Sequence, residues 1–330
     1  MSKSIVSEPS WIDKMNDLGQ RRIPFIFILD FELKKPVILK IGQITEDIYY
    51  KFNDVKNYQL SGIKQKNLQF DIFPINYKKY AEAFDRVIKE IQFGNSFLLN
   101  LTFATEIKTN YSLKELFDIS HAKYKLYFKD EFIVSSPEIF VQIKGNKIYT
   151  FPMKGTIDAS VPNAENIILN DQKETAEHYT IVDLLRNDLS LVAKNVKVNK
   201  FRYIDHLTTS HRTLLQVSSE IEGTLPNDFR SKLGDIFMAL LPAGSVSGAP
   251  KKKTLEIIAE NESDSRGYYT GVFGIFDGEN VDSAVMIRYI EKSDDRLWYR
   301  SGCGITNQSE CASEYKEMID KVYVPIGRKH

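Results

Sequence analysis

Hydrophobic residues along the chain follow helical patterns in some segments and strand patterns in others. In residues 77–94 (YKKYAEAFDRVIKEIQFG) apolar side chains recur at helical intervals, and Gly94 is placed to end the helix. Similar patterns predict helices over residues 112–119, 171–189, 248–260 and 309–322. We therefore expect helices at intervals along the chain from residue 77 onward.

Short apolar runs predict strands around these helices. The first two, PFIFILDF at 24–31 and PVILKI at 36–41, are bounded by Pro and charged residues. Further strands are predicted over residues 97–107, 124–128, 131–134, 139–143, 147–151, 269–276, 281–290 and 297–301, and the polar stretch 53–70 predicts a loop. The chain has more predicted strands than a simple alternation of strands and helices would give. The pattern therefore favours an α+β fold with mostly antiparallel sheets.

Composition and charge exclude several classes of protein. The 330 residues are 42% hydrophobic, and 44 basic residues balance 44 acidic ones, so no global field attracts nucleic acid or an anionic membrane. The start, MSKSIVSEPSWIDKMND, lacks a signal peptide's apolar region, and no run reaches the roughly 18 apolar residues of a membrane span. Cys303 and Cys311, the only cysteines, are expected to be reduced thiols. We expect a cytoplasmic protein with no nucleic-acid or membrane partner.

Two pairs of glutamates are each spaced to share one helical face. Glu174 and Glu177 lie three apart on one predicted helix, and Glu314 and Glu317 lie three apart on another. If the two faces converge, oxygen ligands without a cysteine or a paired histidine favour Mg²⁺. The same spacing is common on solvated helix faces, so the pairs alone do not establish a metal site.

Two glycine-containing stretches are candidate anion sites. LPAGSVSGAPKKKTLEII has Pro250 early in a predicted helix, whose N-terminus attracts anions, although ordinary capping also explains it. In YRSGCGITNQ, Gly302 and Gly304 follow a predicted strand and open the backbone amides to a ligand, with a bulge or hairpin turn as the alternative. Arg288 lies in an apolar predicted strand and needs either a structural carboxylate or a ligand as its partner.

Two further residues are candidates for acid and nucleophilic chemistry. Glu138 lies in SSPEIF and Lys154 in PMKGT. A carboxyl in an apolar setting can act as a general acid, and a desolvated lysine can act as a nucleophile or base. Taken singly, Glu138 fits a surface residue at a strand edge, and Lys154 fits a turn residue.

Taken together and in this order, these segments resemble the chorismate-utilising enzymes. The matching segments are GNSFLLNLT (94–102), SPEIF, PMKGT, ETAEHYTIVDLLRND (174–188), PAGSVSGAPK (242–251), RGYYTGVFG (266–274), IRY, SGCGI and SEYKEMIDK (313–321), so the resemblance covers about 90–325. It implies a four-layer α/β/β/α arrangement of two orthogonally packed, mostly antiparallel sheets. It also implies a shortened N-terminal region, residues 1–75, packed on a catalytic domain of residues 76–330.

Within that family the residue before the glycine of the PxxGT motif separates activities. Anthranilate synthases carry alanine there, whereas a group of aminodeoxychorismate synthases carries lysine, and this chain has Lys154. The resemblance is therefore greatest to component I of aminodeoxychorismate synthase, which aminates chorismate at C4. It implies ammonia from a separate glutamine amidotransferase subunit. Anthranilate synthase component I is the alternative, followed by isochorismate synthase and a non-catalytic member of the family.

The resemblance also assigns roles to individual residues. It implies that Lys154 is the nucleophile, that Glu138 is the general acid, and that Glu177 and Glu317, with Glu174 and Glu314, hold Mg²⁺. The residues implied to contact the substrate are Arg288, Tyr269, Lys321, Ser247, Gly248, Thr156, Gln216 and the amides of Gly302, Cys303 and Gly304. Gln216 departs from the family, which usually has histidine there. Glutamine can orient a hydroxyl, but it does not exchange a proton near neutral pH.

Overall fold

Two nine-stranded antiparallel sheets form the framework of the molecule. The computed structural model describes residues 10–59, 66–208 and 213–326. The first sheet contains, in spatial order, β11 (Met153–Asp158), β13 (Thr213–Thr224), β10 (Lys147–Thr150), β9 (Ile139–Lys144), β16 (Val281–Val285), β15 (Val272–Phe276), β1 (Phe25–Leu29) and β2 (Val37–Lys40), and β12 (Lys194–Thr208) pairs with β13. The second contains β14 (Gly248–Ala249), β6 (Leu98–Thr109), β18 (Arg296–Ile305), β17 (Tyr289–Ser293), β8 (Phe132–Ser136), β7 (Tyr124–Phe128), β3 (Ile48–Phe52) and β4 (Val55–Lys56), and β5 (Phe70–Phe73) pairs with β6.

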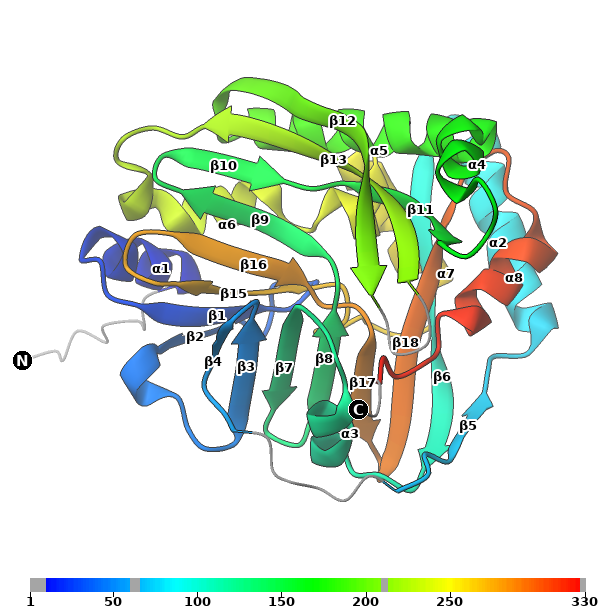
Figure 1. Ribbon diagram of the computed structural model, residues 1–330, viewed down its shortest axis with the longest axis horizontal. Coiled ribbons are helices and arrows are strands. Elements are labelled where there is room, and N and C mark those ends of the chain that lie inside the picture. Colours follow the sequence, from blue (N-terminus) through cyan, green and yellow to red (C-terminus); the bar gives the residue numbers. More distant parts are fainter. Residues whose placement is uncertain (1–9, 60–65, 209–212, 327–330) are drawn as a thin grey trace, which may run out of the picture.

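Helices cover the outer face of each sheet. In Figure 1 the strands of the first sheet run across the view and those of the second run up and down it, so the two sheets cross. One apolar core joins the first sheet to α1 (Trp11–Gln20), α5 (Gln172–Ser190) and α6 (Leu233–Leu240), and another joins β6 and β18 to α2 (Tyr77–Gln92), α7 (Lys251–Asn261) and α8 (Cys311–Asp320). The remaining helical segments are α3 (Leu113–Ile119), α4 (Ala164–Asn170) and the 3₁₀ turns η1 (Ile41–Gln43), η2 (Phe229–Lys232) and η3 (Gly244–Val246).

Strand β1 shows how the sequence produces these layers. All five of its side chains are buried, and successive side chains of a strand point to opposite faces. Phe25 and Phe27 therefore belong to the core under α1 and α6, whereas Ile26 and Ile28 belong to the core between the two sheets. A continuous apolar run at this position is thus the pattern of a strand buried on both sides.

The structure confirms the predicted α+β class and the antiparallel sheets. The helices predicted over 77–94, 112–119, 171–189 and 309–322 are α2, α3, α5 and α8. The strand predicted over 281–290 is wrong as one element, because the chain breaks it into β16 and β17. The predicted loop 53–70 contains the short strand β4, and its residues 60–65 lie outside the described residues.

Several elements have no counterpart in the sequence analysis. They are α1, α4, α6, β3, β5, β11, β12, β13 and β14. The long pair β12 and β13 was missed because its register shifts at three places, between Lys194 and Lys197, Val198 and Lys200, and Lys200 and Tyr203. Each shift interrupts the period-two alternation from which a strand is recognised.

The N-terminal part of the chain enters both sheets. It supplies β1 and β2 to the first sheet and β3, β4 and β5 to the second, and the expected boundary at residue 75 falls between β5 and α2. None of the helices in the described ranges has the length and apolar character that crossing a membrane requires.

A buried ion pair holds the end of α7 against the second sheet. Arg266, only 1% exposed, contacts Glu262 Oε1 at 2.7 Å and Oε2 at 2.8 Å. Its other N–H groups donate to the carbonyl oxygens of Val246 and Asn100 at 2.7 and 2.6 Å, and Glu262 accepts from the Thr102 amide at 2.9 Å. The pair therefore connects η3, β6 and the segment after α7.

Removing the acidic partner tests how much this connection contributes to stability. Glu262→Ala leaves the Arg266 charge buried without its carboxylate, which is expected to lower the free energy of unfolding by about 3–5 kcal/mol. The matched control is Glu256→Ala, because Glu256 forms an exposed pair with Lys253 at 3.2 Å on the same helix and its loss is expected to cost at most about 1 kcal/mol. Urea denaturation measures both. Equal losses for the two variants would contradict the assignment.

Candidate active site

A cavity of about 510 Å³ is lined by residues of both sheets and of α5. Its volume is typical of sites for small organic ligands. The charged side chains of its wall are the basic Lys154, Arg288, Arg300 and Lys321 and the acidic Glu138 and Glu177. Basic groups outnumber acidic ones, so the wall suits an anionic ligand in a chain whose net charge is zero.

Lys154 reaches the cavity from an irregular strand rather than from a turn. It lies in β11, where the register with β13 shifts between Met153 and Thr156. Gly155, within this irregularity, has a φ of +83°, which other residues adopt only with strain, and a Cβ there would lie 3.2 Å from Glu174 Oε2. The interpretation of Lys154 as a turn residue is therefore wrong.

The Lys154 amine is paired with a carboxylate of α5. Lys154 Nζ lies 2.5 Å from Glu177 Oε2, and Lys173 Nζ lies 3.8 Å from Glu177 Oε1. Burial lowers the pKa of Lys154, but Glu177, together with Glu174 and Glu317, raises that pKa above its usual value. In this state Lys154 is an ammonium.

Glu174 has a buried carboxylate oxygen without a partner. It lies one helical turn before Glu177 on α5, and its Oε2 accepts no hydrogen bond from any described residue. Burial raises the pKa of Glu174, and Lys154 acts against this rise. A buried carboxylate oxygen without a donor is a costly arrangement that a cation or a proton would relieve.

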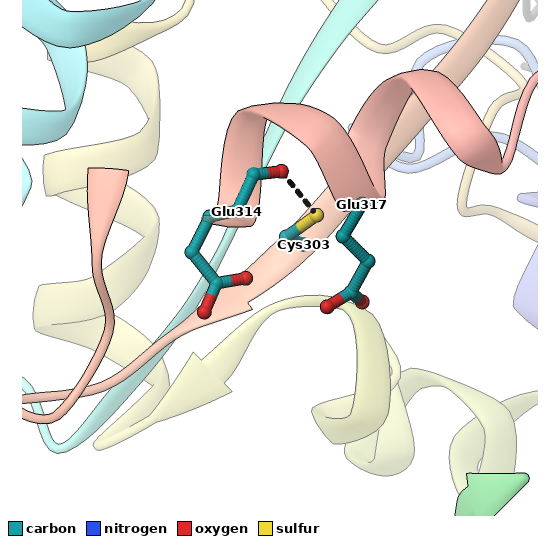
Figure 2. A group of neighbouring side chains, drawn as sticks. All are labelled: Cys303, Glu314 and Glu317. Carbon is teal, nitrogen blue, oxygen red and sulfur yellow. Dashed lines mark hydrogen bonds between the residues drawn. The ribbon is translucent and has the colours of Figure 1, made fainter. Parts of the chain in front are cut away.

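The second glutamate pair lies on one side of α8, next to β18. Figure 2 shows Glu314 and Glu317 pointing the same way, with Cys303 beside them, and one ligand atom from each lies within 4.8 Å of the others. The Cys303 thiol donates to the Glu314 carbonyl oxygen at 3.2 Å, and burial raises the thiol pKa to about 12. A thiol that stays protonated is a poor metal ligand, so the carboxylates are the candidate ligands.

Positive side chains surround this pair as well. Burial raises the pKa of Glu314, whose Oε1 accepts from Ser309 at 2.8 Å, and Lys154 is among the cations that oppose the rise. Burial also acts on Glu317, but Lys321, at 2.8 Å, and then Lys154 lower its pKa below the usual value. Both glutamate pairs therefore lie within the electrostatic range of the Lys154 amine.

The four carboxylates fit a hard divalent cation. Their donors are oxygens, one of them is buried without a partner, and the neighbouring thiol is protonated. Mg²⁺ prefers such oxygen donors and completes its octahedron with water and substrate oxygens. Glu174, Glu177, Glu314 and Glu317 are the residues that would hold it.

Glu138 lies in the cavity wall between β8 and β9. Burial raises the pKa of its carboxyl, while a hydrogen bond from Ser245 Oγ to Oε1 at 2.6 Å, Arg288 and Lys321 act to lower it. The structure therefore contradicts the interpretation of Glu138 as a surface residue at a strand edge. A carboxyl with a raised pKa can be protonated near neutral pH and can donate that proton.

Arg288 lies at the break between β16 and β17, not inside a strand. Its φ is +52°, it lines the cavity, and its guanidinium lies over the Tyr323 ring at 5.0 Å. Its Nε is buried without a hydrogen-bond partner, and Arg288 forms no ion pair with any carboxylate in the described part of the chain. No carboxylate of the described residues is thus paired with Arg288, so its guanidinium is available to a ligand anion.

The glycine stretch SGCGI lies within β18, and not after a strand as expected. Gly302 and Gly304 line the cavity, whereas Cys303 is fully buried among the side chains between β18 and the helices. Alternation along a strand explains the difference. The expectation concerned the backbone amide of Cys303, and the structure adds that its thiol lies away from the cavity.

The other residues predicted to contact the substrate fall into two groups, because some line the cavity and one does not. Tyr269, Gln216, Ser247, Gly248 and Lys321 line the cavity. Thr156 does not line it and is exposed, because the irregularity of β11 turns it away from the side of Lys154.

The predicted helix N-terminus is not part of this wall. Helix α7 begins at Lys251, after the N-cap residue Pro250, and the cavity is lined by Gly244–Gly248 but by no residue of α7. The helix end itself thus lies outside this wall, whereas Ser247 and Gly248 of the preceding loop belong to it.

Some cavity residues escaped the sequence analysis. They are Ser245, Asn100, Arg300 and the segment Thr306–Gln308. Ser245 and Asn100 lie in quoted motifs, but a hydroxyl or amide in a motif does not reveal which way it points. Arg300 carries no sequence signal of its own, since its partner Glu291 becomes a neighbour at 2.6 Å only through the pairing of β17 with β18.

Comparison with known proteins gives one consistent family. The family model for chorismate binding enzymes matches residues 42–327. An uncharacterized PabA-like protein of Pasteurella multocida is 49% identical over 96% of this chain and 99% of its own length. Aminodeoxychorismate synthase component 1 of Bacillus subtilis is 32% identical over 76% of this chain and 55% of its own length. An anthranilate synthase component 1 of Haloarcula marismortui is 34% identical over 74% and 52%, respectively.

A solved structure shares the fold over almost the whole chain. The 2,3-dihydroxybenzoate-specific isochorismate synthase DhbC of Bacillus anthracis superposes with a TM-score of 0.71, covering 95% of this chain and 88% of that chain at 22% identity. At this identity the likeness establishes the fold.

The hydrogen bond between Ser245 and Glu138 predicts a measurable shift. Ser245 donates to the charged carboxylate, so Ser245→Ala is expected to raise the pKa of Glu138 further, while Ser245→Thr keeps the hydroxyl and leaves that pKa close to its original value. Titration of ¹³C-labelled glutamate carboxyls by NMR measures both variants. An unchanged Glu138 pKa in the alanine variant shows that the contact is absent in solution.

Proposed function

The chain belongs to the family of chorismate binding enzymes, and we propose that it acts as component I of aminodeoxychorismate synthase, replacing the C4 hydroxyl of chorismate with an amino group. The observation that carries the proposal is the position of Lys154. Its amine lies in the cavity wall, 2.5 Å from Glu177, with Glu138 in the same wall. Identity to aminodeoxychorismate and anthranilate synthases is similar, so it does not separate these two activities.

The charges of the wall support chorismate as the ligand. Chorismate carries two carboxylates, and Arg288 offers a buried N–H that no described residue uses. Guanidinium groups bind carboxylates through paired hydrogen bonds, so Arg288 is the candidate for one carboxylate. Lys321 is less available, because it lies 2.8 Å from Glu317 and donates to the Gly302 carbonyl oxygen at 2.9 Å.

Lys154 would act as a temporary nucleophile. The Lys154 ammonium first gives up its extra proton to solvent. The neutral amine then forms a bond to ring carbon C2, both ring double bonds shift, and the bond between C4 and its hydroxyl oxygen breaks. The hydroxyl leaves as water with a proton from Glu138, and the proton released by the attacking nitrogen returns Glu138 to its acid form.

Ammonia then replaces the lysine. It bonds to C4, the double bonds shift back, and the bond between C2 and Nζ breaks as the lysine nitrogen takes up the proton that ammonia loses. Chorismate and ammonia thus give 4-amino-4-deoxychorismate and water. We infer that a separate glutamine amidotransferase subunit supplies the ammonia, because all the motifs quoted from this chain match the chorismate-utilising family and none of them is assigned to the release of ammonia from glutamine.

Mg²⁺ held by Glu174, Glu177, Glu314 and Glu317 would supply positive charge to a substrate carboxylate. The protein's own contribution is to place these acidic side chains on α5 and α8, with Glu177 in the cavity wall. Gln216 lines the same cavity and can hold a hydroxyl by hydrogen bonds, but it transfers no proton.

The product of the purified chain tests the proposal directly. With chorismate, Mg²⁺ and ammonium as the nitrogen source, 4-amino-4-deoxychorismate is expected, and chromatography with mass spectrometry identifies it. Omitting ammonium is the control. Formation of anthranilate, isochorismate or salicylate as the main product would falsify the assignment, and anthranilate would establish the alternative synthase.

Replacing the lysine tests its role separately. Lys154→Ala removes the nucleophile and is expected to lower the rate of C4 amination by at least about a hundredfold while chorismate still binds. Equilibrium binding of chorismate, measured beside the rate, distinguishes lost chemistry from lost affinity. An alanine variant with the wild-type rate of C4 amination excludes Lys154 as the nucleophile.

A further inference from the structure

We propose that the Lys154 ammonium is the resident counter-ion of the four-glutamate cluster, and that a divalent cation binds there only by displacing it. The cluster is Glu174, Glu177, Glu314 and Glu317. The inference rests on the proposed function in one respect, namely that these carboxylates hold Mg²⁺. It adds that metal binding and release of the lysine are a single exchange.

The first argument is that the lysine occupies a ligand atom. Lys154 Nζ lies 2.5 Å from Glu177 Oε2, which is a direct, charge-assisted contact. The other oxygen of Glu177 faces Lys173 Nζ at 3.8 Å. A metal ion that coordinates Oε2 of Glu177 must therefore replace the Lys154 ammonium at that atom.

The second argument concerns the charge of the surroundings. Each pair of glutamates already has an ammonium in contact with one of its members: Lys154 lies 2.5 Å from Glu177 on α5, and Lys321 lies 2.8 Å from Glu317 on α8. Like charges in a partly buried site repel strongly, because the surrounding protein screens them less than water does. An ammonium and a divalent cation are therefore not expected to share this position.

The third argument concerns where the displaced amine can go. Lys154 belongs to the cavity wall as well as to the cluster, and its side chain is 34% exposed, so it is not packed in place. Released from Glu177, the amine has the cavity to move into. Arrival of the metal thus frees the same group that the proposed reaction uses, and a metal-free protein holds its nucleophile paired with Glu177.

The test compares Mg²⁺ affinities in the absence of chorismate. Lys154→Met keeps a long apolar side chain but removes the charge, and we expect its Mg²⁺ dissociation constant to fall on the order of tenfold below that of the wild type. Lys154→Arg keeps a cation beside Glu177 and is expected to bind no more tightly than the wild type. Isothermal titration calorimetry with MgCl₂ measures all three proteins.

A matched control separates this exchange from a general change of charge. Lys316 lies on α8 like Glu314 and Glu317, but it pairs with Asp320 on the exposed side of the helix. Lys316→Met removes the same formal charge and is expected to leave the Mg²⁺ dissociation constant within about twofold of the wild-type value. If Lys154→Met does not fold without Mg²⁺, Lys154→Gln replaces it.

The outcomes separate this inference from the proposed function. Tighter Mg²⁺ binding by Lys154→Met than by Lys154→Arg and Lys316→Met supports the exchange. Equal affinities in wild type and Lys154→Met overturn it, and so does an absence of Mg²⁺ binding in both. The amination itself is judged by its product, so a wild-type chain that makes 4-amino-4-deoxychorismate keeps the proposed function whichever affinities are found.

Discussion

The buried pair of Arg266 and Glu262 is the interaction on which the position of the cavity wall depends. Arg266 holds the backbone of Val246 and Asn100, and both of these residues line the cavity. Burying two charges is expensive, and the cost is recovered only when their hydrogen-bonding groups are satisfied. Here the guanidinium finds carboxylate and carbonyl oxygens on three segments. The pair therefore selects one arrangement of η3 against β6.

Most of the basic side chains that line the cavity beside this pair already form ion pairs. Glu177 holds Lys154, Glu317 holds Lys321, and Glu291 holds Arg300. Arg288 differs, since its charge lies against an aromatic ring and one of its N–H groups has no acceptor among the described residues. A ligand anion can therefore meet Arg288 without first breaking an ion pair, whereas contact with the other cations requires an exchange of partners.

The sequence was sufficient for the fold class and for much of the site, because the signals involved are local. Helical periodicity located α2 and α5, and motif order brought Glu138, Lys154 and Arg288 into one hypothesis that the cavity supports by placing all three in its wall. The sequence was insufficient where the direction of a side chain depends on a register shift between paired strands. Thr156 and Lys154 are two apart and would share a face of a regular strand, but the register shift in β11 separates them. The contact between Ser245 and Glu138 was likewise invisible, because 107 residues of chain separate them.

The cavity wall formed by β18 differs from the wall formed by β11 and β13. On the side of β18 Gly302 and Gly304 present backbone alone, and a Cβ at Gly302 would lie 2.6 Å from the Leu101 carbonyl oxygen of the neighbouring strand. A side chain cannot be added at Gly302 without disturbing the sheet, whereas at Gly304 a Cβ would meet only the end of the Leu98 side chain at 3.2 Å. On the side of β11 and β13, Lys154 and Gln216 are ordinary side chains that can be exchanged one at a time. The shape of the cavity beside Gly302 is thus set by backbone packing, whereas its chemistry on the side of β11 and β13 is set by single side chains.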